Sequence, residues 1–173
     1  MKPQLGDTIL NRYTLVSSLR EEPGIQAWKA NDRVLAKDCQ LFIITNRSAF
    51  AAIDELAGRM AATRPDRVIP VLKYRMESDV LLIVMPVDSG QCLTDYMVDT
   101  AKPLSYSAIR SIIGECADVL REVIADTPSG IVITTDTVRV TTSGVQIADA
   151  PCATILADTS ATDLRTDGPE RYA

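Results

Sequence analysis

The sequence contains no histidine, and this absence excludes several classes of enzyme at once. Ser-His-Asp and Cys-His hydrolases need an imidazole as their general base, and most zinc enzymes use histidine as a ligand. Long apolar runs are also missing, since no stretch approaches the roughly 18 residues that a membrane-spanning helix requires. The protein is therefore not expected to be a histidine-dependent hydrolase, a typical zinc enzyme or a protein inserted in a membrane through this chain.

Cysteine pairs and a signal peptide are lacking as well. The four cysteines form no Cys-x-x-Cys pair and lie far apart, at Cys39, Cys92, Cys116 and Cys152. This spacing suggests neither a zinc site nor a disulfide framework, and it favours reduced thiols. The first residues, MKPQLGDTIL, have no basic start followed by an apolar stretch, so a cytoplasmic location is expected. The net charge of −5 argues against a nucleic-acid partner.

What is present begins with an alternating pattern. Tyr13, Leu15, Ser17 and Leu19 predict a half-buried strand, which a charged turn over residues 20–24 follows. Two further strands are predicted over residues 25–30 and 39–45. A helix is expected over residues 50–63, with Ser48 as its N-cap, because apolar residues recur there every three or four positions, at Phe50, Ile53, Leu56, Ala57, Met60 and Ala61.

The remaining elements are predicted from the same two periodicities. Strands over residues 68–74 and 80–85 complete a five-stranded antiparallel sheet. A short helix is expected over residues 93–98. A long one over 105–124 should bury one apolar face and end at Pro128-Ser129-Gly130. A hairpin turning at Thr142-Ser143-Gly144 should join strands 138–141 and 145–148.

Two segments align without gaps to protein-kinase motifs. LREEPGIQAWKA matches LGRGGMGEVYRA, and DRVLAKDCQLFII matches DRVLGRDVALKVL, while LLIVMPVDSGQCLTDYM is similar to an interlobe hinge. The chain thus resembles a bacterial, specifically actinobacterial, Ser/Thr protein-kinase domain. The resemblance implies an α+β protein-kinase-like fold. Residues 1–86 would form a five-stranded antiparallel small lobe with one helix. Residues 87–173 would form the hinge and an incomplete, mainly helical large lobe.

Within this resemblance the residues of catalysis are replaced. The glycine positions of the phosphate-binding loop carry Arg20, Glu22 and Ile25, and the lysine that contacts the phosphates becomes Phe42. Glu55 stands where the helix glutamate would pair with that lysine. Met85 falls on the gatekeeper and Val87 on the hinge, so an apolar adenine slot could persist without a phosphate site.

The catalytic loop can be aligned in two registers, and both lack a general base. One places Val132 at the catalytic aspartate, Thr134 at the lysine and Thr137 at the metal-binding asparagine. The other aligns Gly130-Ile131-Val132 with GIVHRD, so that Ile133-Thr134-Thr135 replaces the His-Arg-Asp triplet. Asp136 is the only nearby carboxylate that could substitute for the base. Asp149 falls on the other metal-binding position, in Asp-Ala-Pro.

The resemblance therefore implies a pseudokinase that binds no cofactor or metal and acts as a regulatory protein-binding scaffold. Related pseudokinase domains, including one on a lipid II flippase in cell-wall regulation, are phosphorylated by an active Ser/Thr kinase and then recruit a forkhead-associated-domain protein. The candidate acceptors lie in the region resembling an activation segment: Thr154, Thr159, Ser160, Thr162 and Thr166. Two alternatives remain. One is a weak Mg-ATP-dependent enzyme using Asp149 and Asp136. The other is a module that forms homodimers through the helix over 50–63 or the one over 105–124.

Overall fold

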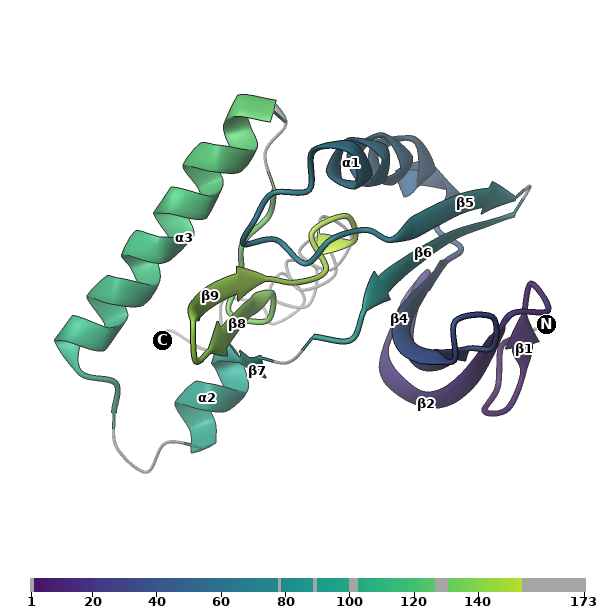
Figure 1. Cartoon of the computed structure of the whole chain (residues 1–173), viewed down its shortest axis with the longest axis horizontal. Helices are drawn as coiled ribbons and strands as arrows, with labels where there is room; N and C mark the ends of the chain where they lie inside the picture. Colours follow the sequence, from purple (N-terminus) through teal and green to yellow (C-terminus); the bar gives the residue numbers. More distant parts are fainter. Residues whose placement is uncertain (1, 78, 89, 100–102, 127–130, 154–173) are drawn as a thin grey trace, which may run out of the picture.

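The computed structural model describes residues 2–77, 79–88, 90–99, 103–126 and 131–153. In these residues a six-stranded antiparallel sheet has the order β1-β2-β3-β4-β6-β5, and a three-stranded sheet has the order β7-β8-β9. The larger sheet and α1 form one end of the molecule, and the smaller sheet forms the other end with α2 and α3 (Figure 1).

The first part of the chain forms the larger sheet and one helix. Its strands are β1 (Thr8–Ile9), β2 (Tyr13–Glu22), β3 (Ile25–Asp32), β4 (Lys37–Ile44), β5 (Lys73–Glu77) and β6 (Val80–Pro86). A short 3-10 turn, η1 (Arg47–Ala49), leads into α1 (Phe50–Thr63). The helix has the predicted bounds. The sheet has one strand more than predicted, because β1 is two residues long and too short to show a period.

Alternating residues of the central strands serve two separate cores. On β4, Leu41 and Ile43 lie on one face of the sheet, in a cluster with Trp28 of β3. Phe42 and Ile44 lie on the other face, in a larger cluster that includes α1 and residues of α3, β8 and β9. A strand that is buried on both faces should read as a continuous apolar run, as residues 41–44 do. The larger cluster joins the two ends of the molecule.

The predicted alternation over residues 13–19 holds only at its start. Tyr13 and Leu15 are buried, whereas Leu19 is 51% exposed. The pairing of β2 with β3 shifts twice, between Leu15 and Ser17 and between Ser18 and Arg20. Each such bulge inserts a residue and changes which face the following side chains occupy.

The charged turn predicted over residues 20–24 is shorter in the structure. Strand β2 continues to Glu22, which pairs with Ile25, so Pro23 and Gly24 alone make the turn. Gly24 has a φ of +79°, and a Cβ there would lie 2.8 Å from the Cβ of Asn46. Glycine is therefore required by both backbone angle and space.

Two other predictions are corrected in this region. The capping side chain is Asn46 and not Ser48, because Asn46 Oδ1 accepts the Ser48 N–H at 3.2 Å at the start of η1. The strand predicted from residue 68 begins only at Lys73. Residues 67–69 bind the smaller sheet instead, since Ile69 N–H donates to Ile147 O at 2.8 Å.

The second part of the chain confirms the predicted helices and hairpin with small shifts in their bounds. Its elements are β7 (Gln91–Cys92), α2 (Leu93–Asp99), α3 (Tyr106–Asp126), β8 (Val138–Thr141) and β9 (Gly144–Ile147). The two-residue strand β7 was not predicted. The predicted helix stop at residues 128–130 lies outside the described residues. No helix in the described ranges is long and apolar enough to cross a membrane.

Candidate functional site

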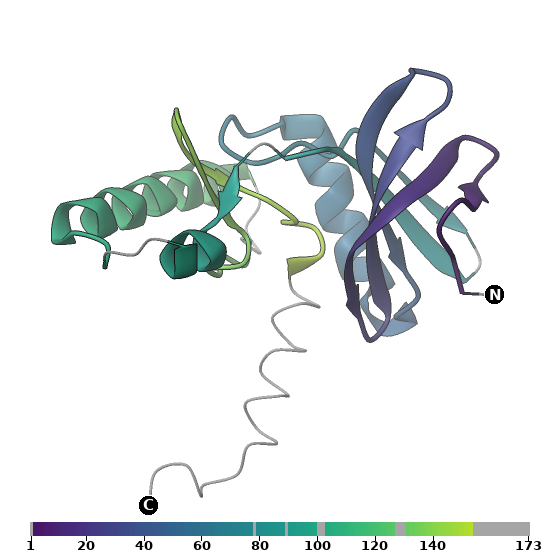
Figure 2. The same cartoon turned by 90° about the horizontal axis from the view of Figure 1, so that it is seen from below.

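A cleft of about 480 Å³ lies where the larger sheet faces the smaller one. Figure 2 shows the two sheets from below, joined by the segment that connects β6 to β7. Charged and polar side chains from both sheets, from α2 and from the connecting segments line the cleft: Arg20, Lys29, Gln40, Asp88, Asp95, Asp136, Arg139 and Asp149. Its apolar lining includes Leu19 and Val87.

Asp149 is the most buried carboxylate of this cleft, with 4% of the residue exposed. It follows β9 with a φ of +56°, and its carbonyl accepts the N–H groups of Cys152 and Ala153 at 2.7 and 2.9 Å. Its carboxylate faces two residues of the larger sheet. Gln40 Nε2 donates to Oδ1 at 3.4 Å, and Arg20 Nη1 lies 4.0 Å from Oδ2. These contacts cross the cleft.

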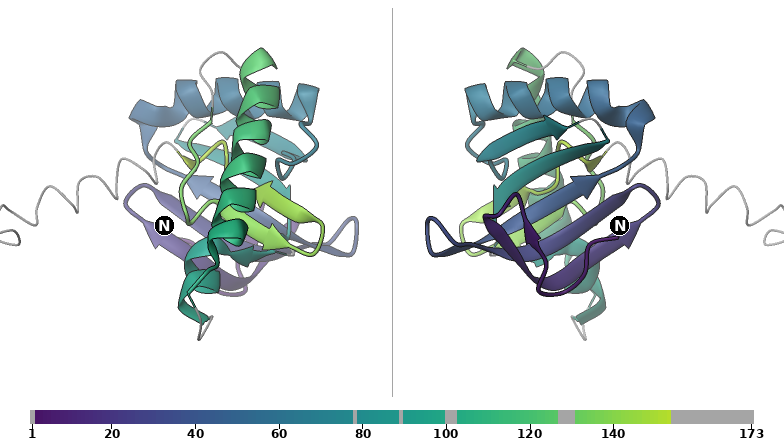
Figure 3. Two further views of the ribbon diagram at one scale, coloured as in Figure 1. Left: turned by 90° about the vertical axis from the view of Figure 1, so that its left-hand side faces the viewer. Right: turned by 90° about the vertical axis from the view of Figure 1, so that its right-hand side faces the viewer.

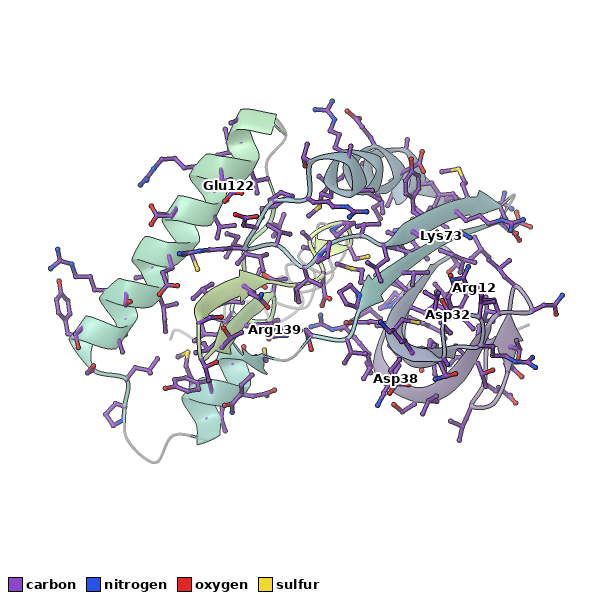
Figure 4. The ribbon with its side chains drawn as sticks, viewed as in Figure 1. Arg12, Asp32, Asp38, Lys73, Glu122 and Arg139 are labelled. Atoms are coloured by element: carbon purple, nitrogen blue, oxygen red, sulfur yellow. The ribbon has the colours of Figure 1, made fainter. Side chains whose placement is uncertain are left out.

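Arg139 lies on β8 (Figure 4). It connects Asp149 to the segment between the sheets. Its Nη2 lies 3.8 Å from Asp149 Oδ2, and its Nε donates to Asp88 Oδ2 at 2.6 Å. Gly90 lies next to Arg139, and a Cβ at position 90 would lie 2.6 Å from the Cβ of Arg139. A larger residue at position 90 would displace the arginine. We call Arg139, Asp88, Asp149, Arg20 and Gln40 the cleft network.

Burial and charge act in opposite directions in this network. Burial raises the pKa of Asp149, and the guanidinium groups of Arg139 and Arg20 oppose that rise without cancelling it. Burial lowers the pKa of Arg139, but the hydrogen bond to Asp88 and the charges of Asp88 and Asp149 outweigh it, so the pKa rises. Arg139 is thus a fixed cation between two carboxylates.

The residues at the predicted lysine and glutamate positions do not meet. Phe42 is fully buried in the cluster that includes Ile53 and Leu56 of α1. The Glu55 side chain is 64% exposed and pairs with Arg59 one helical turn away, at 2.6 Å. An aromatic side chain packed against α1 stands where the resemblance places a lysine.

The three predicted loop positions have different surroundings. Arg20 points into the cleft, and its Nε lies 3.6 Å from a carboxylate oxygen of Glu22. Ile25 is buried in the core. Glu21 pairs with Lys2 on the outer side of the turn. The residues near the turn therefore form ion pairs and carry charges of both signs.

Among the residues at the predicted hinge and catalytic-loop positions, Met85, Val87, Val132 and Thr137, only Val87 lines the cleft. Met85 is buried in the core, and Val87 is 43% exposed and lines the cleft. Val132 is half-buried. Thr137 is buried and holds its own loop, since its Oγ1 accepts the Thr134 N–H at 2.8 Å.

Asp136, the predicted substitute base, has a side-chain contact with α2. Its Oδ1 accepts the hydroxyl of Thr94 in the first turn of α2 at 2.8 Å. It lines the same cleft as Asp149. The candidate phosphoacceptors over residues 154–166 lie outside the described residues.

Sequence reasoning did not single out Gln40, Asp88 or Arg139. Gln40 left a signal, because it is a polar residue in the otherwise apolar run from Cys39 to Ile44. Asp88 and Arg139 left none, since they are 51 positions apart and only the fold brings them together. In the described residues no group of three or more Cys, Asp or Glu side chains is arranged to hold a metal ion.

The overall arrangement is that of known kinase domains. No family model matches the sequence, and no curated protein is significantly similar to it. Three crystal structures of the PknI kinase domain of Mycobacterium tuberculosis are similar, with TM-scores of 0.73, 0.70 and 0.71. Each is 16% identical, and the matches cover 88%, 87% and 88% of this chain. The chain spans 64%, 62% and 63% of those domains. It therefore has a protein-kinase-like fold, as predicted.

Proposed function

We propose that this chain is a catalytically inactive, kinase-like domain that acts as a regulatory protein-binding scaffold. The observation that carries the proposal is the cleft network. Asp149, the one residue at a metal-binding position that is still acidic, is 4% exposed and faces Arg139, Arg20 and Gln40. A metal ion would have to displace these internal partners before it could reach the carboxylate.

The charges of the cleft support the same proposal. Phosphoryl transfer depends on cations and N–H groups that position the phosphates and stabilise their charge. Besides Asp149, the carboxylates of Asp88, Asp95 and Asp136 line this cleft. The cation nearest to Asp149, Arg139, is bound to Asp88 at 2.6 Å and is not free for a phosphate. These residues do not fit a site for Mg-ATP.

A lost lysine could be compensated from a neighbouring strand, but the nearest candidate on β3 is engaged. Lys29 lines the cleft, and its Nζ pairs with Asp38 of β4 at 2.9 Å. Phe42 offers no charge, and Val132 offers no base. At these positions the chain therefore offers neither a free cation to position the phosphates nor a base to accept a proton.

The partner class follows from the family resemblance. An active Ser/Thr kinase would phosphorylate one or more of Thr154, Thr159, Ser160, Thr162 and Thr166. A forkhead-associated-domain protein would then bind the phosphothreonine through arginine side chains. Each phosphate adds about −1.5 to −2 charges and three strong acceptors.

The test compares phosphorylated and untreated protein. The chain is incubated with an active bacterial Ser/Thr kinase and Mg-ATP, its modified residues are mapped, and binding of a forkhead-associated domain is measured. We expect phosphate on residues 154–166 and binding that requires it. A variant with these five hydroxyls replaced by Ala should bind nothing, and Thr142→Ala, at an exposed hairpin turn, should bind normally. Binding that ignores phosphorylation would contradict the proposal.

The second candidate is a weak Mg-ATP-dependent enzyme. The observation in its favour is that Asp136 and Asp149 line one cleft. It predicts phosphate transfer by the purified chain alone, abolished in Asp149→Ala. The scaffold proposal predicts no transfer in either protein.

A further inference from the structure

A second hollow, of about 450 Å³, lies between α2 and α3 and is lined by apolar side chains alone. Met97 of α2, Leu104 of the connection and Ile109 and Ile113 of α3 form its walls. Figures 1 and 3 show α3 at the end of the molecule farthest from the six-stranded sheet, with α2 beside one end of it. The groove and the cleft network have no lining residue in common.

The groove continues along α3 as an exposed apolar stripe, which we define as Tyr106, Ile109, Ile113 and Ile124. Their exposed fractions are 80%, 41%, 63% and 53%. At 100° per residue they share one flank of the helix, whereas the buried Val119 and Val123 face the core. The sequence predicted one apolar face for this helix. In the structure the helix has two apolar faces, of which one is buried and the other is exposed to solvent. Exposed apolar side chains gathered on one flank of a helix mark a candidate interaction site.

Two arginines lie beside the stripe. Arg110 and Arg121 are eleven positions apart, about three turns, so they lie in line on the outer margin of the stripe. The acidic residues of the helix lie on its other sides. Glu115 binds Arg67 and the Val145 N–H, and Glu122 accepts the Asp66 N–H at 3.1 Å. Asp118 pairs with Arg121 from the side away from the stripe.

A second copy of the chain is a poor occupant of this surface. In a two-fold dimer both copies contribute the same patch, and the acidic residue beside it, Asp118, is already paired with Arg121 of its own copy at 2.8 Å. In an antiparallel pairing centred on the stripe, Arg110 of one copy would approach Arg121 of the other. Like charges brought together at an interface disfavour that pairing.

We infer that the α2–α3 groove and the stripe bind an amphipathic helix of another protein, with apolar side chains at three- and four-residue spacing and Asp or Glu along one edge. Such a helix would lay its apolar residues in the groove and along Ile109 and Ile113, with its acidic edge against Arg110 and Arg121. This inference rests on the proposed scaffold role and specifies one surface and the chemistry of its partner.

Two synthetic helical peptides of about 20 residues test it. Both carry leucines at positions i, i+3, i+7 and i+10; one has glutamates along the edge and the other lysines. Binding of each labelled peptide to the full chain is measured by fluorescence anisotropy. We expect the glutamate peptide to bind at least about tenfold more tightly than the lysine peptide. The R110E/R121E variant should reverse that preference, and Ile113→Asp should abolish binding of both.

Matched controls separate the surface from the fold. R33E/R59E makes the same charge change on β3–β4 and α1, and it should leave the preference intact. Ile113 is largely exposed, so Ile113→Asp should unfold at the temperature of the parent protein. If it does not fold, the charge reversal in R110E/R121E still decides the question.

Three results would overturn the inference: no binding of either peptide, equal affinity for both, or a concentration-dependent dimer in sedimentation that Ile113→Asp dissociates. The last would assign the surface to a second copy. Mg-ATP titrations of the same samples are independent of the peptides. A nucleotide-binding cleft would therefore refute the inactive-domain proposal without touching this surface, and loss of peptide binding alone would refute only the surface.

Discussion

Two aspartates that are equally buried, each 4% exposed, behave differently in the two ends of this molecule. Asp32, at the end of β3, accepts two hydrogen bonds from Arg12, at 2.9 and 2.6 Å. It also accepts the N–H groups of Val34 and Leu35, at 3.0 and 3.2 Å. The shortest side-chain contact of Asp149 in the cleft is 3.4 Å, from Gln40.

The pKa values of the two carboxyl groups shift in opposite directions. The hydrogen bond from Arg12 lowers the pKa of Asp32 despite its burial. Burial dominates at Asp149 and raises its pKa. The small-lobe carboxylate is a structural anchor, whereas the cleft carboxylate is a buried charge with loose partners. Burial alone therefore does not show whether a charge stabilises a fold.

We expect the largest loss of stability when Phe42, in the core of the first part of the chain, is replaced by lysine. Phe42→Lys would place an ammonium group in the core, whereas Glu55 is exposed and already pairs with Arg59. We expect a loss of roughly 3–5 kcal/mol in the free energy of unfolding, measured by urea denaturation, and no gain of ATP binding. The control Phe42→Leu should lose about 1–1.5 kcal/mol. A stable Phe42→Lys protein that binds ATP would show that the catalytic frame is intact.

Replacing Asp32 should have the next largest effect on stability. Asp32→Ala leaves the Arg12 guanidinium and two N–H groups without their acceptor. We expect a loss of about 2–3 kcal/mol in the free energy of unfolding. Asp32→Asn keeps one oxygen acceptor and should lose less. Equal losses in both variants would mean that the carboxylate charge, and not the volume or the single acceptor that asparagine keeps, holds this turn.

The acid dependence of stability should also identify Asp32. Its native pKa lies below the ordinary value of 3.8, so ionised Asp32 stabilises the fold above that value. This contribution is lost as the pH falls through the native pKa. Urea denaturation between pH 5 and pH 2 should show a shallower loss in Asp32→Asn than in the parent protein. Parallel curves would contradict the anchor role.

Neutralising the cleft carboxylate should have the smallest effect. Asp149→Asn keeps the side-chain shape and one acceptor, and it removes a carboxyl group whose pKa is raised by burial. We expect its free energy of unfolding at pH 7 to lie within about 1 kcal/mol of the parent value, or above it. Because the raised pKa means that stability falls as Asp149 ionises, the variant should gain on the parent as the pH rises. A loss of stability comparable to that of Asp32→Ala would contradict the proposed difference between the two aspartates.

The two regions also differ in how far the sequence predicted them. Residues 41–44 and 50–63 carry strong local patterns, so the buried strand and α1 are placed correctly. The bulges in β2 left no pattern, and they put Leu19 at the cleft instead of in the core. Local periodicity reports which face a residue takes only while the register is unbroken.

The cleft was predicted in outline but not in its contacts. Asp149 and Arg20 were identified by alignment to kinase motifs, and the structure brings both to one site. Arg139 and Asp88 were not, because an ion pair between residues 51 positions apart depends on the pairing of β7 with β8. Gln40 could have been suspected, since a polar residue in a buried strand needs a partner.

The most direct test of an inactive cleft is isothermal titration calorimetry of ATP into the full chain, with and without Mg²⁺, beside the Asp149→Ala variant. The cleft network predicts no heat of binding at millimolar nucleotide in any of these titrations. Binding that requires Mg²⁺ and is lost in Asp149→Ala would contradict it, because Asp149 would then exchange its internal partners for a metal ion.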